Sequence, residues 1–457
     1  MNTRILLLLF GFLLLTTSTA LTQVNDTSSD SALADYVALP DESHTWKLVQ
    51  SARLGTAEYL EIKMTSQSWR GIVWKHQLFI IKPSQVDPEV KHAMLFVTGG
   101  SWREEMDNDE FRQKVPREAV MFVSIAEQLK TPIAILLQVP FQPIFDGKYE
   151  DAIIAHTFDE YLKSRDPQWP LLLPMVKAAV RSMDVTQAAC QQEWDVPIET
   201  FTVSGASKRG WTTWLTGAVE PRATAIAPIV IDVLDMDQQM RHQKLAWGDL
   251  SDEINDYTRL GLIEKLSTPE GRQLLSIVDP FSYREHLTQP KLIIIGTNDR
   301  YWPVDALNLY WDQLEGEKHI LYVPNQGHGV KDLVRLTSTL GEFHRRAALG
   351  KSLPQLQWTF QKNGGSVDLE ASSDEAPGKF RVWTARSQTR DFRDAHWDNQ
   401  AVGPNAGIYR KSVALPGQGF IAAFAEAVYD ASDAPFFLST NVVVLNVDGI
   451  DQALRAP

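Results

Sequence analysis

The sequence predicts an α/β protein with a mostly parallel central sheet, a helical insertion and a C-terminal antiparallel β-domain. Three observations predict this class. Short apolar runs alternate with helical patterns along the middle of the chain, β-like runs with alternating polarity precede them, and β-like runs return near the C-terminus. With 457 residues, 44% of them hydrophobic, the chain is long enough to bury a large core in more than one domain.

The first residues have the features of a secretory signal peptide. Arg4 gives a positive start, an apolar run extends over Ile5–Leu15, and small residues end at Ala20. The alternative is a membrane anchor, but a spanning helix needs about 20 apolar residues, more than this run provides. We therefore expect residues 1–20 to be removed, no transmembrane segment in the mature chain, and a periplasmic or secreted protein. Residues 21–35, rich in Thr, Ser and Asp, are expected to form a flexible lead-in.

The α/β domain is predicted to cover residues 36–350. It begins with β-rich runs between Thr45 and Lys82, which indicate an antiparallel meander at one edge of a sheet. Continuous apolar runs then indicate strands that are buried on both faces and joined by right-handed helical crossovers. These runs are Ala93–Val97, Ile133–Leu137, Thr200–Val203, Ala223–Ile231, Lys291–Ile295 and His319–Val323.

Two further regions are expected from changes in this pattern. Between residues 232 and 290 the apolar runs give way to a polar helical pattern, which predicts a lid-like insertion over the carboxyl ends of the strands. Residues 351–457 return to β-like runs separated by turn signals such as Asn363-Gly364-Gly365. They predict a small antiparallel β-domain, most simply a sandwich.

Charge and cysteine content exclude several classes of protein. A net charge of −13 and a pI near 5.3 argue against general affinity for nucleic acid or anionic membranes. The single cysteine, Cys190, excludes an intramolecular disulfide framework and is expected to be a packing residue. No cluster of His, Cys and Asp has metal-ligand spacing, so no metal or other cofactor is predicted.

A serine follows the predicted strand Thr200–Val203 in a tight turn. The run Gly205-Ala206-Ser207-Lys208-Arg209-Gly210 gives strand, turn, serine and helix, the context of a nucleophile elbow. The run departs from G-x-S-x-G, because Arg209 occupies the second glycine position and the glycine follows at Gly210. Taken alone, the pattern equally fits an ordinary turn in which Ser207 caps the helix.

An aspartate and a histidine follow two later strands. Asp299 comes after the strand ending at Ile295, and His328 lies between glycines after the strand ending at Val323. Asp232 is an alternative acid, but no proline-containing turn follows it, and we expect it to organise the insertion. Ser207, Asp299 and His328 occur in the chain order of α/β-hydrolases, each after a predicted strand, and together they predict a catalytic triad.

The remaining site candidates lie near the same strand ends. Glycines after the strand Met94–Val97 predict an oxyanion hole formed by backbone N–H groups of Gly100 or Ser101 together with that of Lys208, although a plain glycine turn has the same pattern. Four aromatic residues are candidates for a substrate-binding wall, although most aromatic residues in such positions are core. They are Trp102, Trp211, Tyr301 and Trp302.

The chain resembles the PhoPQ-activated pathogenicity-related proteins. The resemblance rests on the block Val203–Trp214, with Val97–Trp102 before it and Gly296–Asp299 and Asn325–His328 after it, and extends from about Tyr36 into the C-terminal β-region. It implies an exported, α/β-hydrolase-like protein whose regulation has been linked to virulence and to resistance to membrane-active peptides, and it implies no defined substrate. The elbow is also similar, locally, to the Gly-x-Ser-(Arg/Lys)-x-Gly elbow of glucuronoyl esterases.

These observations predict an exported serine hydrolase that cleaves an ester or amide bond without a cofactor. Its expected partner is a small-molecule ester or a peptide, and the sequence indicates neither the natural substrate nor the oligomeric state. A peptidase acting on cationic peptides is one alternative, which acidic residues such as Glu104 in the pocket would favour. The other is a non-catalytic binding protein that retains the fold and engages a partner through its C-terminal β-domain.

Overall fold

The computed structural model describes residues 32–108, 111, 118–431 and 434–451. The predicted signal peptide and residues 21–31 of the predicted lead-in lie outside these ranges. Within the ranges, no helix is both long and apolar enough to cross a membrane.

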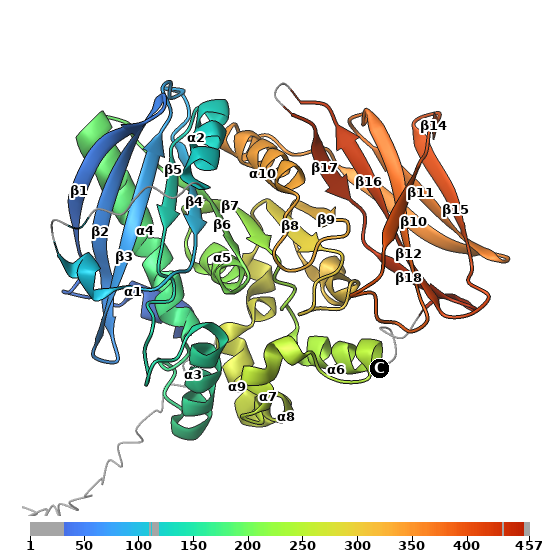
Figure 1. Ribbon diagram of the computed structural model, residues 1–457, viewed down its shortest axis with the longest axis horizontal. Helices are drawn as coiled ribbons and strands as arrows, with labels where there is room; N and C mark the ends of the chain where they lie inside the picture. Colours follow the sequence, from blue (N-terminus) through green and yellow to red (C-terminus); the bar gives the residue numbers. More distant parts are fainter. Residues whose placement is uncertain (1–31, 109–110, 112–117, 432–433, 452–457) are drawn as a thin grey trace, which may run out of the picture.

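A nine-stranded sheet forms the centre of the molecule (Figure 1), with the order β1-β2-β3-β5-β4-β6-β7-β8-β9. β1, β2 and β3 form an antiparallel meander, β3 pairs antiparallel with β5, and the neighbours from β5 to β9 are parallel. The prediction of a mostly parallel sheet with an antiparallel edge is therefore confirmed, and the fold is that of the α/β-hydrolases. The strands are β1 (Thr45–Leu54), β2 (Ala57–Trp69), β3 (Ile72–Lys82), β4 (His92–Val97), β5 (Ile133–Leu136), β6 (Thr200–Ala206), β7 (Ala223–Ile229), β8 (Lys291–Gly296) and β9 (Lys318–Val323).

Helices cover both faces of this sheet, which explains why its parallel strands are apolar on both sides. In β4, Leu95 and Val97 pack in one core with the helices on one face, whereas Met94 packs in the second core on the other face. The first face carries α3 (Glu150–Ser164), α4 (Leu172–Trp194) and α5 (Lys208–Val219), and the second carries α2 (Glu118–Leu129) and α10 (Leu333–Ala348).

Two observations concern α4. Cys190 is buried in this helix, where burial raises the pKa of its thiol to about 12. The short helix α1 (Ala32–Ala38) packs against α4 with Leu33 and Tyr36 buried, and Lys177 of α4 donates a hydrogen bond of 2.6 Å to the carbonyl of Leu39. Residues 32–35, part of the predicted flexible lead-in, are thus helical, and Leu33 packs against the core.

The insertion between β7 and β8 is helical, as predicted. Its helices are α6 (Met236–Trp247), η3 (Asp252–Ile254), α7 (Asn255–Thr258), α8 (Leu262–Lys265), α9 (Pro269–Val278) and η4 (Pro280–His286). Of these helices, α7, α8 and α9 lie beside α3 (Figure 1).

After α10 the chain forms two antiparallel sheets that share a small core, a sandwich as expected. β16 is buried along nearly its whole length because it lies between two layers. Ile421 and Ala423 face the other sheet, whereas Ala422 and Phe424 belong to the core of the α/β region, where Phe424 lies 5.4 Å from Tyr322 of β9 between ring centroids. The strands are β10 (Leu356–Asn363), β11 (Ser366–Ser373), β14 (Pro404–Asn405) and β15 (Ile408–Ala414) in one sheet, and β12 (Lys379–Ser387), β13 (Trp397–Ala401), β16 (Phe420–Tyr429), β17 (Phe436–Ser439), β18 (Val443–Asn446) and β19 (Gly449–Ile450) in the other.

Candidate active site

Ser207 lies in the sharp turn between β6 and α5. Its backbone has φ 59° and ψ −126°, a conformation that side chains rarely adopt and that a strained nucleophile elbow requires. The two neighbouring glycines allow this turn. A Cβ atom at Gly205 would lie 2.8 Å from the Cβ atom of Arg209, and one at Gly210 would lie 2.6 Å from Cγ2 of Ile231. The glycine at 210, one place later than in G-x-S-x-G, therefore lets α5 pack against the end of β7.

His328 lies in hydrogen-bonding contact with this serine, and Asp299 lies in hydrogen-bonding contact with His328. The distance is 2.8 Å between Nε2 of His328 and Oγ of Ser207, and 2.9 Å between Nδ1 of His328 and Oδ2 of Asp299. The carboxylate of Asp299 is buried, and its other oxygen accepts the backbone N–H of Tyr301 at 2.8 Å. The ring of Tyr301 lies over the imidazole, 4.2 Å between centroids. The three residues that the chain order suggested thus meet at the carboxyl ends of β6, β8 and β9.

Asp232, the alternative acid, is placed elsewhere. Its Oδ1 accepts a 2.6 Å hydrogen bond from the hydroxyl of Tyr310, and its Oδ2 has no hydrogen-bond partner among the described residues. Burial raises the pKa of this carboxyl to about 7, with Asp299 and Asp305 adding to the rise. The oxygen that contacts His328 belongs to Asp299.

The loop after β4 has free backbone donors. Gly100 has φ +113°, which favours glycine. The loop is fixed by hydrogen bonds from the N–H of Gln138 to the carbonyl of Gly99 at 2.9 Å and from the N–H of Trp102 to the carbonyl of Gln142 at 3.1 Å. Within the described residues, the N–H groups of Gly100 and Ser101 make no hydrogen bond. Lys208 is the first residue of α5, where backbone N–H groups have no partner within the helix.

Sequence reasoning recorded Arg209 only as a departure from the motif. Its guanidinium donates to the carbonyl of Val139 at 2.6 Å and to both carboxylate oxygens of Glu150 at 2.7 and 2.6 Å. It lies against Gly99, where a Cβ atom would be 2.1 Å from Nη2 of Arg209. Glu150 also accepts a 2.8 Å hydrogen bond from Gln142, whose amide donates to the carbonyl of Gly100 at 3.1 Å. Arg209 therefore supports the loop that carries the free backbone donors. The sequence signal for this contact was Gly99, where the missing side chain leaves room for the guanidinium.

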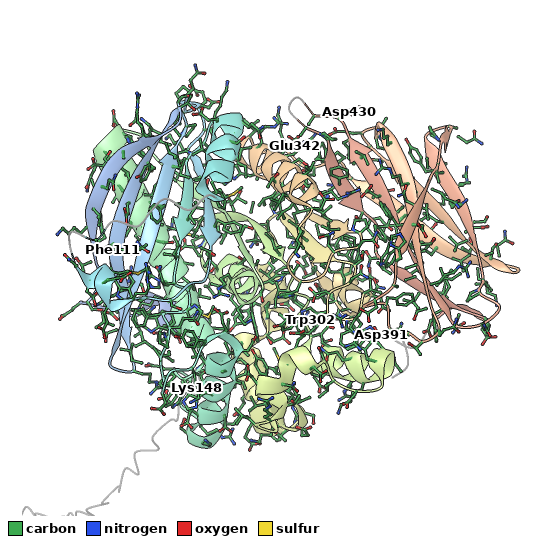
Figure 2. All side chains as sticks on the ribbon, in the orientation of Figure 1. Phe111, Lys148, Trp302, Glu342, Asp391 and Asp430 are labelled. Carbon is green, nitrogen blue, oxygen red and sulfur yellow. The ribbon has the colours of Figure 1, made fainter. Side chains whose placement is uncertain are left out.

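The segment of residues 388–397, which leads from β12 into the first residue of β13, was also not singled out from the sequence. Asn298, next to Asp299, donates to the carbonyls of Ala395, Arg393 and Phe392 at 2.7, 3.2 and 3.3 Å. Asn325, in the loop of His328, exchanges two hydrogen bonds with the backbone of Trp397, at 2.8 and 3.0 Å. Asp391, labelled in Figure 2, belongs to this segment and lies close to α6.

Buried charges fix the same segment in place. Arg390 donates to Asp305 at 2.7 Å and to Asp451 at 2.7 Å, and Asp305 also lies 2.8 Å from Nε2 of His242 in α6. The guanidinium of Arg393 lies 4.2 Å from the ring centroid of Trp247 at the end of α6. The C-terminal β-region thus contacts both the insertion and the loops of Asp299 and His328.

A pocket opens beside Ser207 and His328. Of the four predicted aromatic residues, Trp211, Tyr301 and Trp302 line it. Trp302 lies between the central sheet and the insertion (Figure 2). Trp102 lies outside this lining, and its ring is 6.4 Å from that of Phe141 between centroids. Its backbone N–H donates to the carbonyl of Gln142.

Other side chains with relevant chemistry lie in or near this region. Nζ of Lys208 is 2.6 Å from Oδ2 of Asp151, whose Oδ1 accepts a 2.9 Å hydrogen bond from the hydroxyl of Tyr257. Glu104 lies in the 3₁₀ helix η2 (Glu104–Asp107), is exposed, and lies outside the pocket lining. Over the described part of the chain, no group of three His, Cys, Asp or Glu residues is placed to hold a metal ion.

Comparison with known proteins places the chain in a family. The model of the family described as PhoPQ-activated pathogenicity-related protein matches residues 33–393. Autocrine proliferation repressor protein A of Dictyostelium discoideum is 33% identical over 437 residues, which cover 87% of this chain and 85% of that protein. Among solved structures, acetyl xylan esterase 1 from Thermoanaerobacterium sp. JW/SL YS485 aligns with a TM-score of 0.46 and 16% identity over 70% of this chain and 94% of its own. The glucuronoyl esterase from Solibacter usitatus aligns with a TM-score of 0.41 and 12% identity over 71% of this chain and 92% of its own. On the family match and the Dictyostelium relative, this chain belongs to the PhoPQ-activated pathogenicity-related protein family.

Proposed function

We propose that this protein is an exported serine hydrolase that cleaves an ester or amide bond, with Ser207 as nucleophile, His328 as general base and Asp299 as the acid that orients it. The observation that carries the proposal is the chain of hydrogen bonds from Ser207 through His328 to Asp299, at 2.8 and 2.9 Å, on a serine with φ 59°. An ordinary helix-capping serine needs neither the histidine nor the strained backbone.

The reaction follows from these contacts. Nε2 of His328 takes the proton of the Ser207 hydroxyl as Oγ bonds to the substrate carbonyl carbon. The backbone N–H groups of Gly100 or Ser101 and of Lys208 hold the negative oxygen that forms. When the bond to the leaving group breaks, His328 returns the proton to that group. Water then repeats these steps on the acyl-enzyme, releasing the acid and restoring Ser207. Asp299 stabilises the charged imidazole throughout.

The cellular setting belongs to the same proposal. The signal-like residues 1–20 support export to the periplasm or outside the cell. The family description, PhoPQ-activated and pathogenicity-related, supports extending the proposal to a role in virulence or in resistance to membrane-active peptides.

The test is covalent labelling of the purified mature protein with a tagged fluorophosphonate, followed by mass spectrometry. Label is expected on Ser207, and it should be lost in Ser207→Ala and strongly slowed in His328→Ala. Ser204→Ala is the matched control, because Ser204 lies on the same strand with its hydroxyl bonded to the carbonyl of Ala227 at 2.7 Å, away from the histidine. A folded protein that takes no label would contradict the proposal.

A second candidate is a secreted binding or signalling protein. The observation that favours it is the name of the Dictyostelium relative, which describes an autocrine repressor of proliferation and mentions no enzyme activity. If this candidate holds, Ser207→Ala keeps the full effect of the protein on cells. If the effect depends on catalysis, the variant loses it.

A further inference from the structure

The pocket beside Ser207 has walls made almost entirely of apolar side chains. Ile231 and Val233 lie at and after the end of β7, Met236 and Met240 come from α6, and Ile254 and Ile263 come from the helices that follow. The cavity itself measures about 50 Å³, and the space is about 530 Å³ when the open solvent at its mouth is counted. The insertion supplies most of this wall.

The charges at the pocket edge neutralise each other. Of the described residues that line the pocket, Asp151 alone carries a carboxylate. Both its oxygens are engaged, by the ammonium of Lys208 at 2.6 Å and the hydroxyl of Tyr257 at 2.9 Å. The side chains of Lys208 and Asp151 are only 11% and 14% exposed, so a substrate cation would have to displace a shielded partner. The pocket offers apolar contact and no free countercharge.

We infer that this pocket binds the acyl group of the substrate, and that the substrate is a neutral ester with an aliphatic or other apolar acyl group. The inference rests on the proposed function. The acyl group becomes bonded to Ser207 in the first half of the reaction and stays there until water releases it in the second, whereas the alcohol leaves at the end of the first half. A group that stays beside Ser207 gains most from a pocket that opens onto it.

The chemistry of the wall gives two quantitative expectations. Each methylene group that enters the pocket should raise kcat/KM about fourfold, the factor that corresponds to burial of one CH₂, until the pocket is full. A positively charged acyl group would lose its hydration without gaining a free carboxylate, so cationic peptides should be poor substrates. The described geometry therefore argues against the alternative of a peptidase for cationic peptides.

The experiment compares p-nitrophenyl acetate, butanoate, hexanoate and octanoate as substrates of the mature protein. Because the leaving group is constant, differences in kcat/KM report the acyl group. The expected result is a rise from acetate to butanoate and hexanoate. Equal kcat/KM for all four esters, or faster cleavage of a p-nitrophenyl ester of lysine than of hexanoate, would overturn the inference.

Two variants of Met240 locate the effect in this pocket. Met240→Trp fills the space and should abolish the preference for hexanoate over acetate, whereas Met240→Ala enlarges it and should shift the optimum to a longer chain. Leu245→Trp is the matched control, because Leu245 lies on the same helix, is 49% exposed and lies outside the pocket lining. If all three variants keep the acyl profile of the wild type, the preference belongs to another surface.

A measurement without catalysis separates this inference from the proposed function. Saturation-transfer NMR of hexanamide with Ser207→Ala reports occupation of the pocket directly, and Met240→Trp in the same background should remove the signal. Hexanamide binding without ester cleavage or fluorophosphonate labelling would refute the serine hydrolase and keep an apolar-ligand site. Cleavage that is independent of chain length, with no hexanamide signal, would keep the hydrolase and refute the acyl pocket.

Discussion

The two sides of the candidate site are supported by different chemistry. The loop with Gly100 is supported from within the α/β region by an ion pair, Arg209 with Glu150. The loops of Asp299 and His328 are supported by neutral amides, Asn298 and Asn325, which bond to the backbone of residues 388–397 in the C-terminal β-region. The first loop is held directly by a charge pair, whereas the other two are held by neutral amides bonded to a segment that Arg390 in turn ties to Asp305.

This difference teaches what each support needs in order to work. A buried ion pair holds a loop firmly only while both partners remain, because a charge left without its partner is costly. Amide-to-backbone bonds are individually weaker and do not titrate, but they require the C-terminal region to stay in place. Phe424 packs in the core of the α/β region, which keeps that region docked. The C-terminal sheets therefore contribute to the site as well as to the core.

The largest effect is expected from Arg209→Ala. The change leaves Glu150 without its main partner and removes the contact with Gly99. The free energy of unfolding should fall by about 1–2 kcal/mol, less than for a fully buried pair, because the Glu150 side chain is 35% exposed and water solvates its carboxylate. kcat should fall about 100-fold, as when an oxyanion donor is lost. Urea unfolding measures the change in stability, and ester hydrolysis measures the change in kcat.

Arg346→Ala is the matched control for this charge. Arg346 lies on α10, far from Ser207. Its side chain is 16% exposed and pairs with Glu342 and Glu375. It should lower stability and leave kcat within about twofold, since surface ion pairs away from a site change its geometry little. An equal loss of kcat in both variants would mean that Arg209 acts only through global stability.

A smaller effect is expected from Asn325→Ala. It removes two neutral hydrogen bonds to Trp397 and should cost about 1–2 kcal/mol of stability. kcat should fall about tenfold with little change in KM, because the loop of His328 loses its anchor while the pocket wall is untouched. Steady-state kinetics on one p-nitrophenyl ester distinguishes these parameters.

Asn308→Ala provides the comparison for this amide. Asn308 also connects the α/β region to the C-terminal region, by a 2.8 Å hydrogen bond to the carbonyl of Val442, but it lies outside the loops of Asp299 and His328. We expect Asn308→Ala to have a stability similar to that of Asn325→Ala and a normal kcat. If both variants lost kcat equally, domain docking in general, and not the anchor at residue 325, would set the rate.

The sequence predicted the three residues that meet at the strand ends but not what holds them. Ser207, Asp299 and His328 could be found because each follows an apolar run, and the carboxyl ends of parallel strands meet at one edge of the sheet. Their roles in catalysis remain a proposal. Glu150 supports Arg209 across 59 positions, and Trp397 supports Asn325 across 72. Pairings at that distance leave no local periodicity.

The aromatic candidates show the same limit. Position near a strand end correctly suggested a pocket lining for Trp211, Tyr301 and Trp302. Trp102 lies outside this lining, and a role in substrate binding stays a prediction for all four aromatic residues. The insertion was predicted from a polar helical pattern, but which of its residues face Ser207 depends on how its short helices pack. Strand ends are readable from sequence, whereas loop and insertion geometry is not.

Asp232 extends the comparison of supporting charges to a buried acid without a positive partner. Burial raises the pKa of this carboxyl to about 7, well above its value in the unfolded chain. Between pH 5 and pH 7 the folded protein therefore binds more protons here than the unfolded chain, and stability falls as pH rises, by as much as about 1.4 kcal/mol per pH unit. Asp232→Asn cannot ionise, so its stability relative to the wild type should increase across this interval and change little below pH 4. Thermal or urea unfolding of both proteins at a series of pH values measures the difference. Parallel curves would mean that Asp232 has a countercharge after all, and that unpaired acids in this core are not kept protonated.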